Sequence, residues 1–232
     1  MIPFVWPFSI ILAGPSMSGK TTFVINLLQN LKDMIDTPVD KIIWCHGENN
    51  AIPESVLNNR ITCNKGIPEN FENPYNKAIL IVLDDLMMEA SNAKVCELFT
   101  KGSHHRNLSV ILITQNIFHQ GAYSRDISLN AKYIVMFKNP RDQTQFRYLA
   151  RQIFPENPAD LLRIYKQTTN TPYGYLLIDL TQDISDLLRF RTDIFNRDFG
   201  TIFCILDKDN VSKCEPIEEE QAYVTCVKKF QQ

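Results

Sequence analysis

The sequence has little excess charge, no long apolar run and no clustered cysteines. The formal net charge is −2, from 24 Lys and Arg against 26 Asp and Glu, so no overall basic field draws the chain to polyanions or membranes. No stretch approaches the 18 or so apolar residues of a membrane-spanning helix. The six cysteines show no CxxC spacing, which favours free thiols in a reducing compartment over zinc or disulfides.

Length and composition predict an ordinary globular protein. A chain of 232 residues with 44% hydrophobic and 22% charged residues can bury a sizeable core. The start, Met1 to Ala13, is apolar but has no basic region before it, and its apolar run continues into a glycine-bounded loop. We therefore expect this start to be part of the fold rather than a cleaved signal peptide, and the protein not to be secreted.

Apolar strands alternate with amphipathic helices along most of the chain, which predicts an α/β fold. The run at 78–83 is apolar throughout and the run at 108–113 is apolar except for Ser109, as in parallel strands buried on both faces. We expect further strands at 9–13, 40–45, 133–137 and 175–178, and helices from 20, at 92–101, after Asp142 and at 157–166.

The character of the sequence changes after about Phe195. We divide the chain into a domain at 1–195 and a C-terminal extension at 196–232. Possible strands at 201–206 and 222–227 and the acidic run at 218–220 make the extension compatible with a β-hairpin that carries an acidic stretch. No function follows for it from these residues.

A glycine-bounded loop after the first strand carries the clearest motif. Gly14 and Gly19 bracket four residues, and Lys20 and Thr21 follow, which completes the phosphate-loop pattern G-x-x-x-x-G-K-[ST]. Glycines let the backbone curl so that successive N–H groups and the helix N-terminus face phosphate oxygens. Lys20 is expected to reach the β- and γ-phosphates of ATP, and the Thr21 hydroxyl to coordinate Mg²⁺. The residues expected around the nucleotide are Gly14, Pro15, Ser16, Met17, Ser18, Gly19, Lys20, Thr21 and Thr22.

Polar residues that follow two buried strands complete a hydrolytic site. Asp84 and Asp85 end the strand that begins at Ala78, where ligands bind in parallel sheets. We expect Asp84 to hold Mg²⁺ and Asp85 to act as general base on the attacking water. Gln115 ends the strand from Leu108, where it can orient that water.

Arg106 is a candidate of a different kind. It precedes the strand that ends near Gln115, so it lies at the sheet end opposite the nucleotide. It could serve a neighbouring subunit as an arginine finger, or it could be a solvated loop residue; Arg125 and Arg141 are rivals. His104 and His105 lack metal-ligand spacing.

With these residues assembled, the chain resembles the FtsK–HerA superfamily of P-loop ATPases. It is most similar to the genome-packaging ATPases of Polinton (Maverick), adintovirus and related DNA viruses, relatives of the poxvirus packaging ATPase. The resemblance covers roughly residues 7–195. Its segments are Gly14–Thr21, Leu80–Met87, Lys101–Asn107 with Thr114–Asn116, Ser128–Asp142 and Tyr173–Asp179.

The resemblance implies a core sheet in the order 5-1-4-3-2 and a homo-oligomeric ring. It also implies ATP-driven translocation of double-stranded DNA into a capsid, at its portal vertex, at the site of virion assembly in the host nucleus or cytoplasm. A trans-acting arginine before the strand that ends in Gln matches Arg106 and Gln115. Many relatives have Asp-Glu where this chain has Asp84-Asp85, so catalysis here would rely more on a bridging water or on Gln115.

Two other functions are open on sequence alone. A small-molecule phosphotransferase such as a nucleotide kinase shares the phosphate loop, but the long segment Glu48–Asn76 has only Arg60 and Lys65 as basic residues, unlike an arginine-rich lid. A degenerate P-loop interaction module is disfavoured because the four residues expected to act in hydrolysis are all present: Lys20, Thr21, Asp84 and Gln115.

Overall fold

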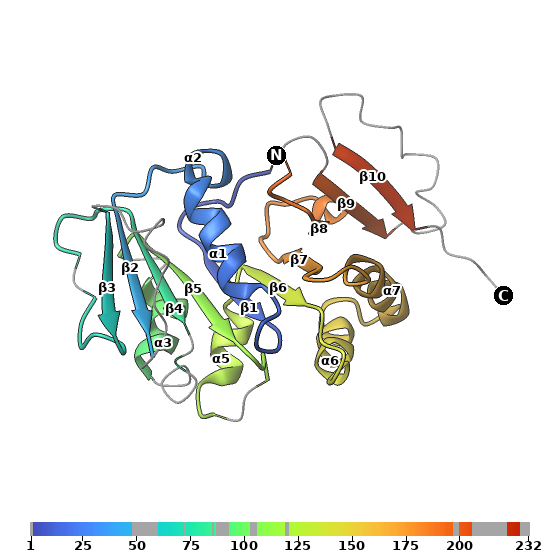
Figure 1. Cartoon of the computed structure of the whole chain (residues 1–232), viewed down its shortest axis with the longest axis horizontal. Helices are drawn as coiled ribbons and strands as arrows, with labels where there is room; N and C mark the ends of the chain where they lie inside the picture. Colours follow the sequence, from blue (N-terminus) through green and yellow to red (C-terminus); the bar gives the residue numbers. More distant parts are fainter. Residues whose placement is uncertain are drawn as a thin grey trace. The chain divides into compact units, whose positions relative to one another are not determined.

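The computed structural model describes residues 2–47, 60–71, 73–84, 86, 93–102, 106–118, 121–196, 200–205 and 222–227. Contacts between residues divide it into two compact units, residues 2–133 and residues 134–232 (Figure 1). The boundary predicted near residue 195 falls inside the second unit.

Residues 2–133 form a parallel sheet with its strands in the order β1-β5-β4-β2-β3. The order β1-β5-β4-β2 is the 1-4-3-2 part of the predicted core, and β3 adds an edge strand. Every residue of β1 and β4 is buried, which the apolar run at 78–83 predicts for β4. The strands span β1 (Ser9–Ala13), β2 (Lys41–His46), β3 (Ile61–Lys65), β4 (Ile79–Asp84) and β5 (Leu108–Thr114).

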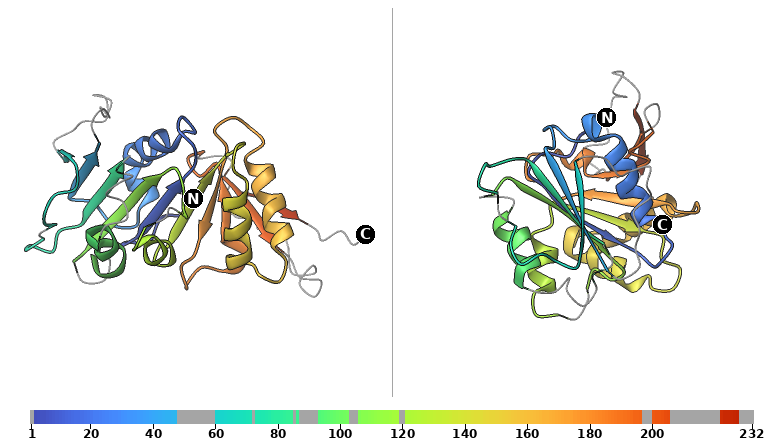
Figure 2. Two further views of the ribbon diagram at one scale, coloured as in Figure 1. Left: turned by 90° about the horizontal axis from the view of Figure 1, so that it is seen from below. Right: turned by 60° about the vertical axis from the view of Figure 1, so that its left-hand side comes forward.

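Helices cover both faces of this sheet. Helix α1 (Lys20–Gln29) lies on one face, and α3 (Ala93–Glu97) and α5 (Ser124–Leu129) lie on the other (Figure 2). The predicted apolar stripe of α1 is buried against the sheet at Phe23, Val24, Leu27 and Leu28. A short helix, α2 (Leu31–Met34), follows α1, and α3 continues into a π-helical turn, η2 (Leu98–Gly102).

The apolar start of the chain belongs to the core of this unit, as expected. Phe4 and Phe8 are almost fully buried, and the ring of Phe4 meets the edge of Tyr133 at 4.8 Å between centroids. The Val5 N–H donates to the Tyr133 hydroxyl at 3.1 Å, and Phe4 forms a β-bridge with Ile35. These contacts fix the chain that leads into β1.

Residues 134–232 contain strands in the order β6-β7-β8-β9-β10. Strand β8 is antiparallel to β7 and β9, whereas β9 and β10 are parallel. The β-hairpin considered for the extension is therefore wrong, because a hairpin joins antiparallel strands. The elements are β6 (Tyr133–Phe137), α6 (Thr144–Ile153), α7 (Pro158–Thr168), β7 (Tyr175–Asp179), η3 (Asp186–Leu188), β8 (Phe190–Thr192), β9 (Gly200–Ile205) and β10 (Ala222–Val227).

Helices α6 and α7 begin close to the predicted positions, but their N-cap residues, Gln143 and Asn157, make no side-chain cap hydrogen bond. The carboxylate of Asp142 accepts hydrogen bonds from the Gln145 side chain and the Thr144 N–H, which lower its pKa from the usual value. Helix α7 begins at Pro158 directly after Asn157, as expected for a proline in the first turn.

One buried ion pair joins two strands of the second unit. Arg191 on β8 donates to the Asp179 carboxylate at 2.5 Å, and both side chains are at most 5% exposed. The Thr181 hydroxyl donates to the other Asp179 oxygen at 2.6 Å. Breaking such a pair leaves a buried charge uncompensated, which typically costs about 3–5 kcal/mol.

No helix in the described part of the chain is both long and apolar enough to cross a bilayer. The cysteines whose side chains are described, Cys45, Cys63, Cys96 and Cys204, form no disulfide.

Candidate functional site

The phosphate loop runs from the end of β1 to the start of α1. The Gly14 N–H donates to the Thr114 carbonyl at 3.3 Å, which ties the loop's first residue to β5. The backbone then turns through left-handed conformations at Met17 (φ 61°) and Gly19 (φ 100°). Gly19 immediately precedes Lys20, the first residue of the helix. The loop therefore has the strand–loop–helix setting that the motif requires.

The side chain of Lys20 is folded back into the loop. Its Nζ donates to the carbonyl oxygens of Gly14 and Pro15, each at 2.7 Å, and the residue is only 9% exposed. A buried ammonium at this position places a positive charge within the curl of the loop. Phosphate oxygens are the anions that such an arrangement binds.

Ser18 shows that the loop has hydrogen-bonding capacity left for a ligand. Its hydroxyl is buried, and no partner for it exists among the residues that the structure describes. A buried polar atom without a partner is costly in a folded protein, so a ligand with acceptor oxygens would relieve it. Thr21 and Thr22 at the start of α1 are exposed. The loop therefore fits a phosphate group on its own geometry.

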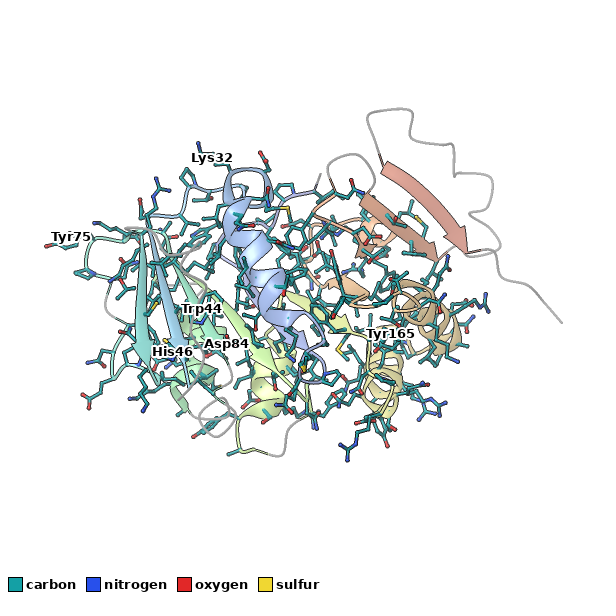
Figure 3. The ribbon with its side chains drawn as sticks, in the orientation of Figure 1. Lys32, Trp44, His46, Tyr75, Asp84 and Tyr165 are labelled. Carbon is teal, nitrogen blue, oxygen red and sulfur yellow. The ribbon has the colours of Figure 1, made fainter. Side chains whose placement is uncertain are left out.

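Asp84 lies at the same edge of the sheet as the loop. It ends β4 and is 5% exposed, and its register partners are Ile113 on β5 and His46 on β2. Ala13, the last residue of β1, pairs with Thr114 of β5. Strand β5 lies between β1 and β4, so two strand spacings, roughly 10 Å, separate Asp84 from the start of the loop. Figure 3 shows Asp84 and His46 together at this end of their strands. Asp85 lies outside the described residues.

Gln115 lies in a turn that hydrogen bonds between its neighbours, Thr114 and Asn116, stabilise. The Thr114 hydroxyl donates to the Asn116 carbonyl at 3.1 Å and accepts from the Asn116 N–H at 3.3 Å. The Asn116 side chain accepts from the Phe118 N–H at 2.8 Å. Gln115 itself is half-buried, and no described residue bonds its amide. Its side chain is thus available at the carboxyl edge, as predicted.

Arg106 lies at the opposite edge, before β5. Its guanidinium is 45% exposed and pairs with Glu97 at 2.9 Å. The structure therefore keeps Arg106 apart from the phosphate loop of its own chain, as the sequence predicts. The rivals Arg125 and Arg141 are also exposed, and His104 and His105 lie outside the described residues.

Sequence reasoning missed two residues near these groups. His46 ends β2 beside Asp84, and its Nδ1 lies 2.7 Å from the Gly47 carbonyl; it could have been noted as the polar residue that ends the second strand. Glu97, the partner of Arg106, lies nine positions earlier on a different element, and no local pattern indicates that pairing.

Comparisons with known proteins support the fold. No family model matches the chain, and neither does any curated protein. The solved structure of the genome packaging NTPase B204 from Sulfolobus turreted icosahedral virus 2 in complex with AMPPCP aligns with a TM-score of 0.50 and 18% identity, over 75% of this chain and 93% of that chain. The same NTPase in complex with AMP aligns with a TM-score of 0.48 and 17% identity, over 78% and 94%. At this identity the likeness shows the fold alone, and this chain has the α/β fold of a P-loop NTPase.

Proposed function

We propose that this chain is a Mg²⁺-dependent ATPase that drives double-stranded DNA into a viral capsid. The observation that carries the proposal is the carboxyl edge of the sheet in residues 2–133. Lys20 is folded into a phosphate loop there, and Asp84 and Gln115 end neighbouring strands at the same edge. Such an edge holds the phosphates, the metal and the attacking water of a nucleotide hydrolase together.

Each residue has a role that its chemistry allows. The Thr21 hydroxyl and the Asp84 carboxylate supply the hard oxygen ligands that Mg²⁺ prefers, and the ion would neutralise charge on the phosphates. Lys20 binds the β- and γ-phosphates. Gln115 orients the attacking water, and Asp85 accepts its proton directly or through a second water.

Arg106 has no access to its own nucleotide in this proposal and acts on the site of the next subunit. Its place at the amino edge and its exposure support this role. The ion pair with Glu97 would hold the guanidinium until a neighbouring γ-phosphate competes for it. A closed homo-oligomeric ring is the assembly that gives every site such a partner.

The DNA and capsid parts of the proposal rest on resemblance. The motif blocks resemble those of packaging ATPases of Polinton-type viruses and their poxvirus relatives, and one solved structure with this fold is of a protein named as a genome packaging NTPase. We accordingly place the protein at the site of virion assembly in the host nucleus or cytoplasm, with the capsid or its portal vertex as partner.

DNA-stimulated ATP hydrolysis tests the motor directly. We expect duplex DNA of any sequence to raise the hydrolysis rate, and the stimulation to weaken as salt rises because phosphate contacts are electrostatic. Light scattering should show an oligomer with ATP. Turnover unaffected by DNA at every salt concentration, with no oligomer, would exclude a motor. Phosphate transfer to nucleosides or nucleoside monophosphates would indicate a phosphotransferase instead.

Subunit mixing tests the arginine finger. We expect Arg106→Ala to keep ATP binding and to lose hydrolysis by roughly 10³-fold or more. Mixing it with Lys20→Ala should restore activity only at interfaces that join an intact Lys20 to an intact Arg106. Arg125→Ala and Arg141→Ala are the comparison variants. If one of them shows the pattern and Arg106→Ala does not, the finger is assigned to that residue.

A further inference from the structure

A cavity in the second unit lies outside the nucleotide site. It has a volume of about 350 Å³ and lies between the segment after β6 and the helices α6 and α7. Three cationic side chains line it, from Lys138, Arg147 and Lys166, together with the amides of Asn139, Gln143 and Asn170. None of the residues that line it is acidic. Its size is at the lower end for ligand pockets, which suits one small polar group.

Two of the three cations have no partner within the described chain. Lys138 Nζ donates to the Asn170 carbonyl at 3.1 Å, but neither a carboxylate nor a carbonyl there pairs with the side chain of Arg147 or Lys166. Some other arginines of this unit are paired: Arg163 on α7 contacts Asp160 at 3.2 Å, and Arg191 contacts Asp179. Two cationic side chains without a partner among the described residues therefore lie at the cavity.

The cavity is built on a packed helix pair. Tyr165 of α7 stacks on Phe146 of α6 with 4.0 Å between ring centroids, and its hydroxyl donates to the Phe137 carbonyl at 2.7 Å. Tyr165 lines the cavity and is buried, and burial raises its pKa. Figures 1 and 2 show α6 and α7 side by side. The buried side of the cavity is therefore held in place by Tyr165, whereas Arg147 and Lys166 are exposed to solvent.

The local charge balance points to an anion. Residues 138–170 hold six Lys and Arg against three Asp and Glu, in a chain whose net charge is −2. A guanidinium with two ammonium groups and neighbouring amides offers donors in the number and charge that a phosphate group accepts. A sequence-blind contact of this kind is what holds a protein on a DNA backbone.

We propose that this cavity binds a backbone phosphate of double-stranded DNA, with Arg147 and Lys166 as its main contacts. The proposal rests on the proposed function for its ligand, since the same chemistry would accept inorganic phosphate or a nucleotide. It predicts a local DNA contact that the acidic overall composition does not reveal.

The test is DNA binding by the full-length protein with Arg147→Gln and Lys166→Gln combined. Fluorescence anisotropy with 30-base-pair duplexes of unrelated sequence should show roughly tenfold weaker binding near physiological salt. The slope of log K against log salt should fall by about 1, because one phosphate contact is lost. Hydrolysis without DNA and the melting temperature should not change, because both side chains are exposed.

Arg151→Gln is the matched control for Arg147→Gln, because Arg151 is exposed on the same helix and does not line the cavity. It should change the slope by less than half as much as Arg147→Gln alone. An equal effect of the two variants, or an unchanged slope in the double variant, would overturn the proposal even if DNA stimulates hydrolysis. Wild-type protein that binds no duplex would overturn the proposed function and this contact together.

A separate titration distinguishes free phosphate from the DNA backbone as the ligand of the cavity. Titration calorimetry with inorganic phosphate is done on Lys20→Ala protein, so that the phosphate loop does not contribute. We expect no saturable binding at millimolar phosphate. Saturable binding that Arg147→Gln abolishes would assign the cavity to a free phosphate or nucleotide and overturn the DNA contact.

Discussion

The two edges of the sheet in residues 2–133 use polar side chains in opposite ways. At the amino edge, Asn73 bonds the Lys77 N–H and the carbonyls of Lys77 and Arg106. Asn107 accepts from the Trp6 indole and donates to the Asn76 carbonyl at 2.9 Å. Side chains there hold the loops together.

At the carboxyl edge, polar groups are left available. The Ser18 hydroxyl is buried without a partner among the described residues, and no described group bonds the Gln115 amide. In Figure 3, Tyr75 marks the first edge, and Asp84 with His46 marks the second. The comparison teaches that Asn73 and Asn107 are satisfied and hold the fold at the amino edge, whereas Ser18 and Gln115 at the carboxyl edge keep hydrogen-bonding capacity for a ligand. Arg106, whose proposed role is in the next subunit, is the exception at the amino edge.

Lys20→Ala should give the largest effect among the variants at the carboxyl edge and should alter function alone. Removing the ammonium from the loop takes away the charge that binds the β- and γ-phosphates, so we expect hydrolysis to fall by at least about 100-fold. The melting temperature should change by only a few degrees. Lys32→Ala, an exposed lysine on α2, is the control and should keep full activity. Hydrolysis within tenfold of wild type would contradict the role of the carboxyl edge.

Asn107→Ala should give the next largest effect and should alter stability alone. It removes two side-chain hydrogen bonds, worth about 1 kcal/mol each, and puts alanine at φ 52°, which costs about 1 kcal/mol more. Urea denaturation should therefore show a loss of about 3 kcal/mol, with the dissociation constant for ATP unchanged.

Asn107→Gly separates the two causes of that loss. Glycine adopts φ 52° freely but also lacks the hydrogen bonds, so it should cost about 2 kcal/mol. Equal losses in the two variants would show that the backbone conformation contributes nothing. A weakened ATP affinity in either variant would mean that the edges are coupled.

The sequence predicts the carboxyl edge better than the amino edge. The phosphate loop is a contiguous motif, and Asp84 and Gln115 end apolar runs that can be recognised as buried strands. The bonds at the amino edge join residues that are far apart: Asn73 and Arg106 are 33 positions apart, and Trp6 and Asn107 are 101 apart. Local patterns carry no information on such pairs.

Local sequence patterns also did not predict the direction of the C-terminal strands or the division of the chain into two units. The extension has two apolar runs, and nothing in either run distinguishes an antiparallel hairpin from the parallel pairing of β9 with β10. The ion pair of Asp179 with Arg191 joins residues 12 positions apart in a way that only the register of β7 and β8 creates. Arg106 was placed correctly at the amino edge because strand direction follows from the α/β alternation, whereas its partner Glu97 depends on the course of α3 and η2.

The smallest effect should come from two buried serines, one at each edge. Ser9 at the start of β1 donates to the Asn130 carbonyl at 2.9 Å and accepts from the Lys132 N–H at 3.0 Å, so Ser9→Ala should lower the free energy of unfolding by about 1–2 kcal/mol.

Ser18→Ala removes a buried hydroxyl that lacks a partner among the described residues, so it should raise the free energy of unfolding by about 1 kcal/mol in the absence of nucleotide. Calorimetry should show the opposite order for ATP, with binding about tenfold weaker in Ser18→Ala and unchanged in Ser9→Ala. If Ser18→Ala destabilises the nucleotide-free protein as much as Ser9→Ala does, the Ser18 hydroxyl is not held for a ligand, and the contrast between the edges does not extend to the loop.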